Sequence, residues 1–418
     1  YGDIPYSEAH DVANPTPVYD DDQAIYRDLY VQLDEAIALI NSADGDDRAV
    51  GGEDPVFNGN MQSWVRFANS IKLRLLLRES GVAASQGYIT GKFAELATAD
   101  FISADVTINP GYTGAQANQQ NPFYRSYGFG IDGTTPGPNR TAVVASSHAV
   151  DYLNGGANNS TGGSTVFDPR LMRLFESIYA NWDDSTDPTD IVASDAAAFN
   201  DFNYAADFFG ATQGELGDSD TPEKLSFLGP GLIKSSSQDG YMMLLAESLL
   251  LQSEAVTRGY MAGDAAALYN SAIAASFATL GVPTADPRPT GQTFDTDGNP
   301  ATPPVNFHPV ADPNYPTLAT YMASIAGTQL DYNTATNKIE AIMTQKWIAL
   351  MGINGIESFI EYTRTGFPVT PLSETATRPT KPRRLLYPAS EFQGNAANAP
   401  VQSVDQAFST GPFWYVGS

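Results

Sequence analysis

Apolar residues recur with helical spacing near the start of the chain. Between residues 22 and 41 they stand three or four positions apart, at Ile25, Leu29, Leu33, Ile37 and Ile40. This period places them on one face, so the pattern predicts an amphipathic helix over 22–41. Aspartates at 20–22 precede it, where they favour the positive end of the helix dipole. Gly45, in an acidic turn, is a stop signal for the same helix.

Further segments show the same helical spacing. They cover residues 61–80, 146–153, 169–179, 241–258, 265–279 and 333–351. The clearest signal comes from 241–258 and 265–279, because small or planar residues stand on facing sides and a short connection joins the two. Two antiparallel helices that pack through small residues resemble a tetratricopeptide repeat. The period does not recur cleanly elsewhere, so this pair alone indicates the repeat.

Two stretches break the helical pattern. Glycine and proline punctuate residues 101–239, which predicts long loops with a few short strands, and residues 282–316 form a proline-rich insertion. We therefore expect a single, mainly α domain over 1–418, with a helical scaffold at about 1–100 and 240–365. The two loop-rich stretches would face the ligand, because a helical scaffold that displays irregular loops is a common way to build a binding surface.

The charge balance narrows the choice of partners. The chain holds 48 acidic and 22 basic residues, a net charge of -26, which disfavours nucleic acid and anionic lipid surfaces as partners. It has no cysteine, so disulfides, thiolate catalysis and cysteine-ligated zinc are excluded. No apolar run approaches the roughly 20 residues of a membrane helix. The longest candidate, 241–251, is interrupted by Glu247.

Glycine motifs do not predict nucleotide binding. Residues 128–133 (GFGIDG) fit GxGxxG, but Pro136 follows in a segment that cannot open the helix needed to meet a pyrophosphate. Residues 87–92 (GYITGK) have three residues between the glycines where a P-loop has four, and Phe93 replaces the magnesium-binding Ser or Thr. We expect both segments to be ordinary loops.

Catalytic motifs are also missing from the sequence. His10, His148 and His308 are widely separated, none lies in HExxH, and there is no GxSxG elbow. With so many acids, spacing cannot identify a glycosidase pair. We therefore expect no enzyme; a surface hydrolase is the alternative, and it would require turnover that a specific acid pair supports.

A short acidic turn suggests two interpretations. Asp295, Asp297 and Asn299 alternate oxygen ligands around Gly298, as calcium loops do. The final Glu of an EF-hand is absent and Pro300 follows, which favours a plain Asp-Gly turn. A calcium site at these three residues is the alternative, and we expect no other cofactor.

Aromatic residues crowd the Gly/Asn-rich stretch 112–140 and a second loop edge at 179–182. An aromatic face suits the C–H face of a sugar ring, and Arg, Asn and Gln can hydrogen-bond its hydroxyls. The same rings could simply anchor a large loop to the helical core. The candidate ligand contacts are Tyr112, Tyr124, Tyr127, Arg140, Tyr179 and Trp182.

Five short phrases carry a resemblance to a known family. They are residues 1–9 (YGDIPYSEA), 64–74 (WVRFANSIKLR), 168–171 (DPRL), 345–349 (QKWIA) and 383–388 (RRLLYP). Their order and spacing, over about 1–398, resemble the SusD/RagB family of Bacteroidetes outer-membrane lipoproteins. The resemblance implies a mainly α fold of tetratricopeptide-like helix pairs with long irregular loops and a few short strands. It also implies that the first helical segment, with its signal peptide and lipid-bearing cysteine, is missing from this sequence.

The resemblance also implies a role. Family members sit lipid-anchored on the extracellular face of the outer membrane, capture nutrient, and act as the lid of a SusC-like TonB-dependent transporter. We expect a non-enzymatic protein that binds an oligosaccharide, or alternatively a peptide, or a structural subunit with no ligand of its own. Ligand contacts vary across the family, so no motif transfers a site. The motif residues are expected to fix packing: Trp64, Arg66, Asn69, Arg74, Asp168, Arg170, Trp347 and Arg384.

Overall fold

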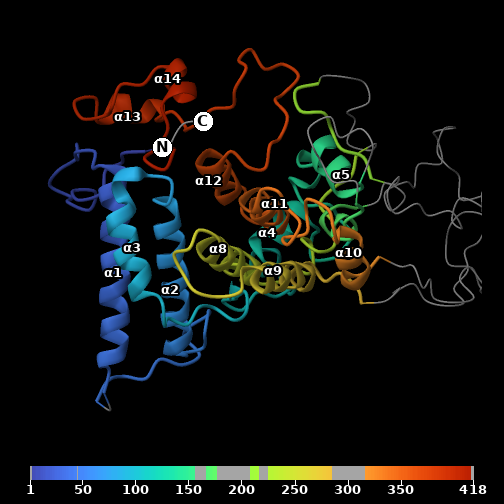
Figure 1. The fold of residues 1–418 in the computed structure, drawn as a ribbon, viewed down its shortest axis with the longest axis horizontal. Helices are drawn as coiled ribbons and strands as arrows, with labels where there is room; N and C mark the ends of the chain where they lie inside the picture. The colour runs from blue at the N-terminus through green and yellow to red at the C-terminus, as the bar shows by residue number, and fades with distance from the viewer. Residues whose placement is uncertain are drawn as a thin grey trace, which may run out of the picture.

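The computed structural model is mainly helical, as expected (Figure 1). It describes residues 2–44, 46–155, 166–176, 208–215, 225–284 and 316–415. In these ranges the elements, in chain order, are α1 (Asp22–Ser42), α2 (Met61–Arg78), η1 (Ala83–Ser85), α3 (Gln86–Glu95), β1 (Val106–Ile108), η2 (Ala117–Gln119), α4 (Pro122–Tyr127), η3 (Arg140–Ala142), α5 (Ser147–Leu153), α6 (Leu171–Leu174), β2 (Gly240–Met243), α8 (Leu245–Thr257), α9 (Ala265–Leu280), α10 (Leu318–Ile325), α11 (Lys338–Leu350), α12 (Gly355–Thr365), α13 (Ala389–Gly394) and α14 (Val404–Ser409).

Helices α1, α2 and α3 form one side of the molecule (Figure 1). The side chain of Asp21 caps α1 by accepting from Ala24 N, and Asn60 caps α2 in the same way. The expected helices over 22–41 and 61–80 are therefore confirmed. Residues 87–92, which we expected to be a loop, lie inside α3. Ile89 and Phe93 are buried one turn apart there, and this packing outweighs the weak helix propensity of two glycines.

A second group of helices, α8, α9, α11 and α12, fills the centre (Figure 1). Helices α8 and α9 pack as the expected pair, with Ala246, Ala255 and Ala272 buried, and α11 lies against both. The expected helix over 241–258 begins too early, however. Its first residues form β2, which pairs antiparallel with β1, and α8 starts only at Leu245. A short apolar run fits a strand as well as a helix, so the pattern could not separate the two.

Two other expected helices are shorter than predicted. In the described part of the segment 169–179, which ends at Glu176, only α6 is helical, because Phe175 turns to an extended conformation and pairs with Leu228. In the segment 333–351 the helix α11 begins at Lys338, where the Asn337 side chain accepts from two backbone N–H groups.

Ion pairs tie the helices of the scaffold together. We call Arg78, Glu254, Lys346, Glu361 and Arg364 the scaffold ion network. All five side chains are buried. One guanidinium nitrogen of Arg364 lies 2.7 Å from Glu254 Oε1, and Lys346 Nζ lies 2.9 Å from Glu361 Oε1. Burial alone would lower the pKa of Arg364, but the two carboxylates outweigh it and raise that pKa. The network therefore holds its charges inside the fold.

Most of the family-motif residues do pack the structure. Arg170 is buried and donates to Asp168, Gln345 and Ser276. Trp64 donates from Nε1 to Asp54 at 2.9 Å, and Asn69 donates to the Asp100 carbonyl at 3.0 Å. Arg74 pairs with Glu247, Arg66 with Asp100, and Arg384 donates to the Tyr387 hydroxyl.

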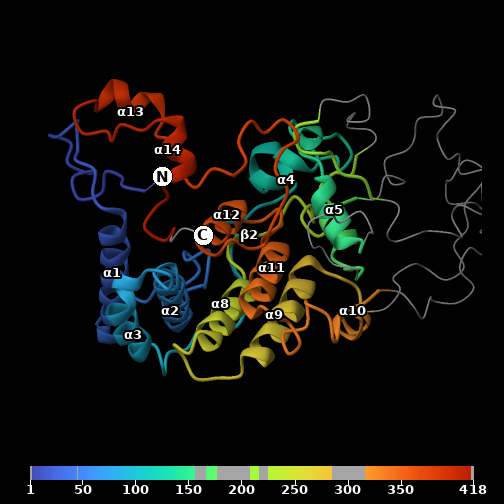
Figure 2. The same ribbon diagram turned by 45° about the horizontal axis from the view of Figure 1, so that its top comes forward.

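The first and last described segments lie side by side (Figures 1 and 2). The Tyr387 hydroxyl donates to the Asp3 carbonyl at 2.7 Å, and Asn395 Nδ2 donates to the Pro17 carbonyl at 2.7 Å. These bonds fasten the chain around α13 to the N-terminal segment. Among the described helices, none is both long enough and apolar enough to cross a membrane.

Candidate ligand-binding cavity

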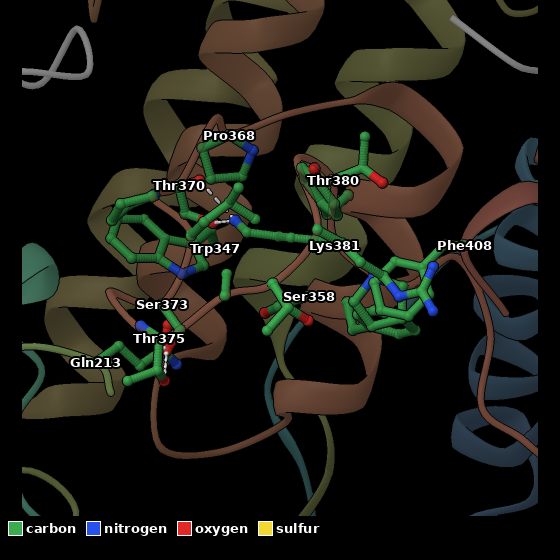
Figure 3. Close-up of a pocket in the computed structure, with 18 of the residues that line it drawn as sticks. Gln213, Trp347, Ser358, Pro368, Thr370, Ser373, Thr375, Thr380, Lys381 and Phe408 are labelled. Atoms are coloured by element: carbon green, nitrogen blue, oxygen red, sulfur yellow. Dashed lines mark hydrogen bonds between the residues drawn. The ribbon is translucent and has the colours of Figure 1, made fainter. Parts of the chain in front are cut away.

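A cavity of about 850 Å³ opens beside α11 and α12. Its outer wall is the segment that follows α12, residues 366–383, which we call the cavity loop. The lining residues are Gln213, Trp347, Ser358, Phe359, Tyr362, Pro368, Thr370, Pro371, Leu372, Ser373, Thr375, Ala376, Thr377, Arg378, Thr380, Lys381, Pro382, Val404 and Phe408. Figure 3 shows the labelled members around the central Lys381 side chain.

Residues at the end of α12 determine where the cavity loop begins. Helix α12 ends at Gly366, whose left-handed backbone (φ +81°) suits glycine, and the prolines that follow cannot continue a helix. The loop is then fixed at two points. Glu374 N donates to the Gln213 carbonyl at 2.8 Å, and Arg383 N donates to the Ala407 carbonyl at 2.7 Å. The loop therefore has defined attachments on both sides of the cavity.

Aromatic rings form one side of the cavity. In α11 every residue from 341 to 350 is buried except Trp347, which is half-buried and lines the cavity. Its ring meets that of Tyr152 edge-on, with centroids 5.4 Å apart, and the His148 ring lies 5.7 Å away. Phe359 and Tyr362 join it from α12. Trp347 thus has a packing role, as expected, and also presents an apolar surface to the cavity.

Hydroxyl and amide groups form another side. Figure 3 shows Gln213, Ser373 and Thr375 together, with Phe408 at the opposite end of the cavity. The hydroxyl oxygens of Ser373 and Thr375 lie 3.0 Å apart. Such groups can both donate and accept hydrogen bonds, which suits a ligand rich in hydroxyls.

Two cations complete the lining. Lys381 Nζ donates to the Thr370 carbonyl at 2.6 Å and to the Thr370 hydroxyl, and it lies 4.8 Å from the Tyr362 ring centroid. Burial lowers the pKa of Lys381 to about 8. Arg378 pairs with Asp405 at 2.7 Å and lies over the Phe408 ring. The pKa of His148 is lowered by burial and by the nearby Lys381 charge, so this imidazole is neutral at pH 7.

The aromatic loop residues chosen from the sequence lie elsewhere. Tyr124 and Tyr127, on α4, pack half-buried against the same hydrophobic cluster as Trp347, but they do not line the cavity. Tyr112 is half-buried, and its backbone N donates to Asn109 Oδ1 at 2.9 Å. Their contacts with ligand remain a prediction.

Arg140 has a more definite position. It is buried, with one guanidinium nitrogen 2.6 Å from each Glu176 carboxylate oxygen, and it lies 4.3 Å from the Phe129 ring centroid. This geometry is that of an anchor for the loop. Tyr179 and Trp182 lie outside the described residues, as do Asp295, Asp297 and Asn299 of the calcium alternative.

Among the described residues, Asp3, Asp21 and Asp22 bring carboxylate oxygens within 4.8 Å of one another. Each of the three accepts a backbone N–H: Asp3 from Asp22 N, Asp21 from Ala24 N, and Asp22 from Phe413 N. Burial raises the pKa of Asp22, because this side chain lies between the N-terminal segment around Asp3 and the C-terminal segment around Phe413. The cap of α1 by Asp21, and the hydrogen bonds by which Asp3 and Asp22 hold the terminal segments together, explain why these carboxylates lie close to one another.

The cavity residues were missed because they come from distant parts of the sequence, from Gln213 to Phe408. One signal could have found them. Residues 378–384 (RPTKPRR) hold four cations in a strongly acidic chain, but we treated the end of this run only as a family phrase.

A helical scaffold with a loop-walled cavity of rings, hydroxyls and cations defines a helical binding protein. The chain belongs to the SusD-like family: residues 1–388 match the family described as "Starch-binding associating with outer membrane". The family and the fold predicted from the sequence are therefore confirmed. The comparison with curated proteins returned no match.

Solved structures share this fold. A chitin-binding protein is 24% identical, with a TM-score of 0.65 over 100% of this chain and 77% of its own. A SusD homologue from Bacteroides fragilis is 19% identical, with a TM-score of 0.64 over 95% of this chain and 75% of its own. A chitin-binding SusD homologue from Flavobacterium johnsoniae is 22% identical, with a TM-score of 0.62 over 100% of this chain and 77% of its own.

Proposed function

We propose that the protein binds an oligosaccharide in the cavity walled by the cavity loop and delivers it to a SusC-like TonB-dependent transporter. In this proposal it is lipid-anchored on the extracellular face of the outer membrane and acts as the lid of the transporter. The observation that carries the proposal is the cavity itself, where rings of α11 and α12 face hydroxyl and amide groups in a chain of this family.

The lining chemistry suits a sugar. Trp347 and Tyr362 offer flat apolar faces to the C–H face of a pyranose, and Gln213, Ser373 and Thr375 offer donors and acceptors to its hydroxyls. The volume, about 850 Å³, lies within the range of about 300–1,000 Å³ that is common for ligand sites. No lining residue belongs to β1 or β2, so the described sheet does not offer the strand edge that would bind an extended peptide.

Isothermal titration calorimetry tests the ligand. We expect at least one member of a panel of neutral and acidic oligosaccharides to bind, with a Kd in the micromolar range or weaker. Trp347→Ala should weaken that binding by about 2 kcal/mol, roughly thirtyfold, because a central tryptophan contact is lost. Phe392→Ala is the control, since Phe392 is an exposed aromatic residue on α13 outside the cavity lining. A thermal melt of each variant separates lost contact from lost fold.

If only peptides bind, the ligand is a peptide and the proposal of an oligosaccharide ligand is wrong. Absence of binding by either class would leave a structural subunit. The transporter requires its own measurement, which is capture of the tagged protein from native outer membrane followed by mass spectrometry. Recovery of a TonB-dependent barrel supports the lid role; recovery without any such barrel would separate this chain from transport.

A further inference from the structure

The end of the cavity loop, together with the residue that follows it, carries an unusual concentration of positive charge. Residues 378–384 include Arg378, Lys381, Arg383 and Arg384, although the whole chain holds only 22 basic residues against 48 acidic ones. In such an acidic protein, four cations within seven residues need a physical role beyond general solubility.

Three of these four cations, Arg378, Lys381 and Arg383, line two cavities. Besides the main cavity, a second one of about 200 Å³ adjoins it, and Tyr362, Thr380, Lys381 and Pro382 line both. Arg383 and Arg364 line the smaller cavity. Within the described residues, the lining of the two cavities contains no Asp and no Glu. The walls thus lack negative charge in a chain where acids outnumber bases more than twofold.

Lys381 is a half-buried cation without a counter-charge. Its ammonium has three donors, and its two hydrogen bonds to described residues both go to Thr370, which is neutral. In the described part of the chain, no carboxylate lies within ion-pair distance of Lys381 Nζ. Holding a partly desolvated charge in this way is unfavourable, and an anion placed in the cavity would offset that cost.

The three arginines near Lys381 differ in how firmly their partners hold them. Arg378 pairs with Asp405, but the Asp405 side chain is 80% exposed, so that bond is weak and open to exchange. Arg383 donates to the Ser409 carbonyl at 2.9 Å and lies over the Tyr415 ring. Arg364, in contrast, is fully engaged by Glu254 and Glu361 in the scaffold ion network.

We propose that the ligand of this site is an acidic oligosaccharide, whose carboxylate or sulfate group binds beside Lys381 and Arg378 while its rings lie against Trp347 and Tyr362. The inference rests on the proposed function and narrows it to one class of sugar. Lys381 acts here as a point charge, and Arg378 can form a two-nitrogen contact once it exchanges Asp405 for the ligand anion.

The test is calorimetry of the full chain at pH 7 with three probes of equal length. They are an oligogalacturonate, a sulfated oligosaccharide, and a neutral malto-oligosaccharide. We expect at least one acidic probe to bind tenfold or more tightly than the neutral one. We also expect its affinity to fall when sodium chloride is raised from low to high concentration, because part of the attraction is Coulombic. The two acidic probes distinguish a carboxylate site from a sulfate site.

Lys381→Met is the matched variant, since methionine keeps the unbranched stem and removes the charge. It should reduce the affinity for the acidic probe about tenfold, and this loss should clearly exceed any loss for the neutral probe. Lys338→Met is the control, because Lys338 also donates to a backbone carbonyl (Tyr332, 2.9 Å) and lies over an aromatic ring, but outside the cavity. Arg378→Gln gives a second variant should Lys381→Met unfold.

The outcomes separate the two proposals. If the neutral probe binds as tightly as both acidic probes, the inference is overturned while oligosaccharide binding stands. If an acidic probe is preferred but neither Lys381→Met nor Arg378→Gln changes the preference, the assignment to this cavity is overturned. If no oligosaccharide binds, both the inference and the proposed function fail.

Discussion

The scaffold ion network and the cavity loop use the same kinds of side chain in opposite ways. In the scaffold, Arg364 is buried and meets two carboxylates, Glu254 and Glu361. In the loop, Lys381 is half-buried, donates hydrogen bonds to Thr370 and lies over the Tyr362 ring, and no carboxylate among the described residues pairs with it. A paired buried charge fixes the positions of helices, while an unpaired charge at a cavity wall remains available to a ligand. Pairing with buried carboxylates separates the structural Arg364 from the candidate functional cations, since Lys381 has no carboxylate partner among the described residues and the partner of Arg378 is exposed.

The largest expected effect comes from breaking the scaffold side of this comparison. Arg364→Met leaves Glu254 and Glu361 buried with one partner fewer, and we expect the free energy of unfolding to fall by about 3–5 kcal/mol. Urea denaturation followed by circular dichroism measures it. Arg378→Met is the control and should cost less than about 1 kcal/mol, since its ion pair is exposed. Equal losses in the two variants would contradict the distinction.

The comparison can also be reversed by giving Lys381 a partner. Thr370→Asp places a carboxylate next to the ammonium and makes the cavity wall resemble the scaffold. We expect the affinity for an acidic oligosaccharide to fall at least about tenfold, because the new carboxylate repels the ligand and competes for Lys381. Thr370→Asn keeps the size without the charge and should bind almost as the native protein does. Loss of affinity in both variants would show that the Thr370 hydroxyl, and not charge, matters.

A third test removes the charge with pH. Desolvation lowers the pKa of Lys381 to about 8, so the ammonium is mostly charged at pH 7 and mostly neutral at pH 9. Binding of an anion requires the charged form, and we therefore expect acidic-probe affinity to fall by up to about tenfold between pH 7 and pH 9. His148 does not interfere, because its pKa is lowered and it stays neutral over this interval. Calorimetry at both pH values measures the change, and Lys381→Met should abolish it.

The smallest expected effect concerns the aromatic loop. Tyr127→Ala combined with Trp182→Ala should weaken oligosaccharide binding a few-fold, about 0.5–1 kcal/mol, if these aromatic residues contact the ligand as the sequence predicts. The double variant should keep its unfolding temperature within a few degrees. Unchanged affinity by calorimetry would remove these residues from the site and leave them as anchors of the loop.

The helices were readable from the sequence wherever the apolar period was long. Helices α1, α2 and α9 match their predictions closely because each is long, with 21, 18 and 16 residues, and gives the apolar period several turns over which to be recognised. Helix α3 was missed because Gly87 and Gly91 suggest a loop, while tertiary burial of Ile89 and Phe93 decides the matter. Residues 241–243 were placed in a helix because their strand is defined only by the distant partner β1.

The cavity could not be predicted in the same way. Trp347 was correctly placed on a helix and given a packing role, but only the folded cavity loop shows which part of its ring is left uncovered. Arg140 was chosen for its charge beside aromatic rings, and its partner Glu176 is too far away in the sequence to be anticipated. The sequence predicted features that one continuous segment determines, such as the helix that holds Trp347. It did not predict contacts between distant segments, such as the lining of the cavity.

Lys381 lines both cavities together with Tyr362, Thr380 and Pro382, so its side chain is part of the wall that the two cavities share. Its hydrogen bonds to Thr370 hold the ammonium on the side of the larger cavity. A rotation about its side-chain bonds, which needs no movement of the backbone, would change the size of both chambers together. In the proposed function, an anion that draws the ammonium toward itself would also move this part of the shared wall, so the charge of a ligand and the length that the cavity accommodates would be coupled.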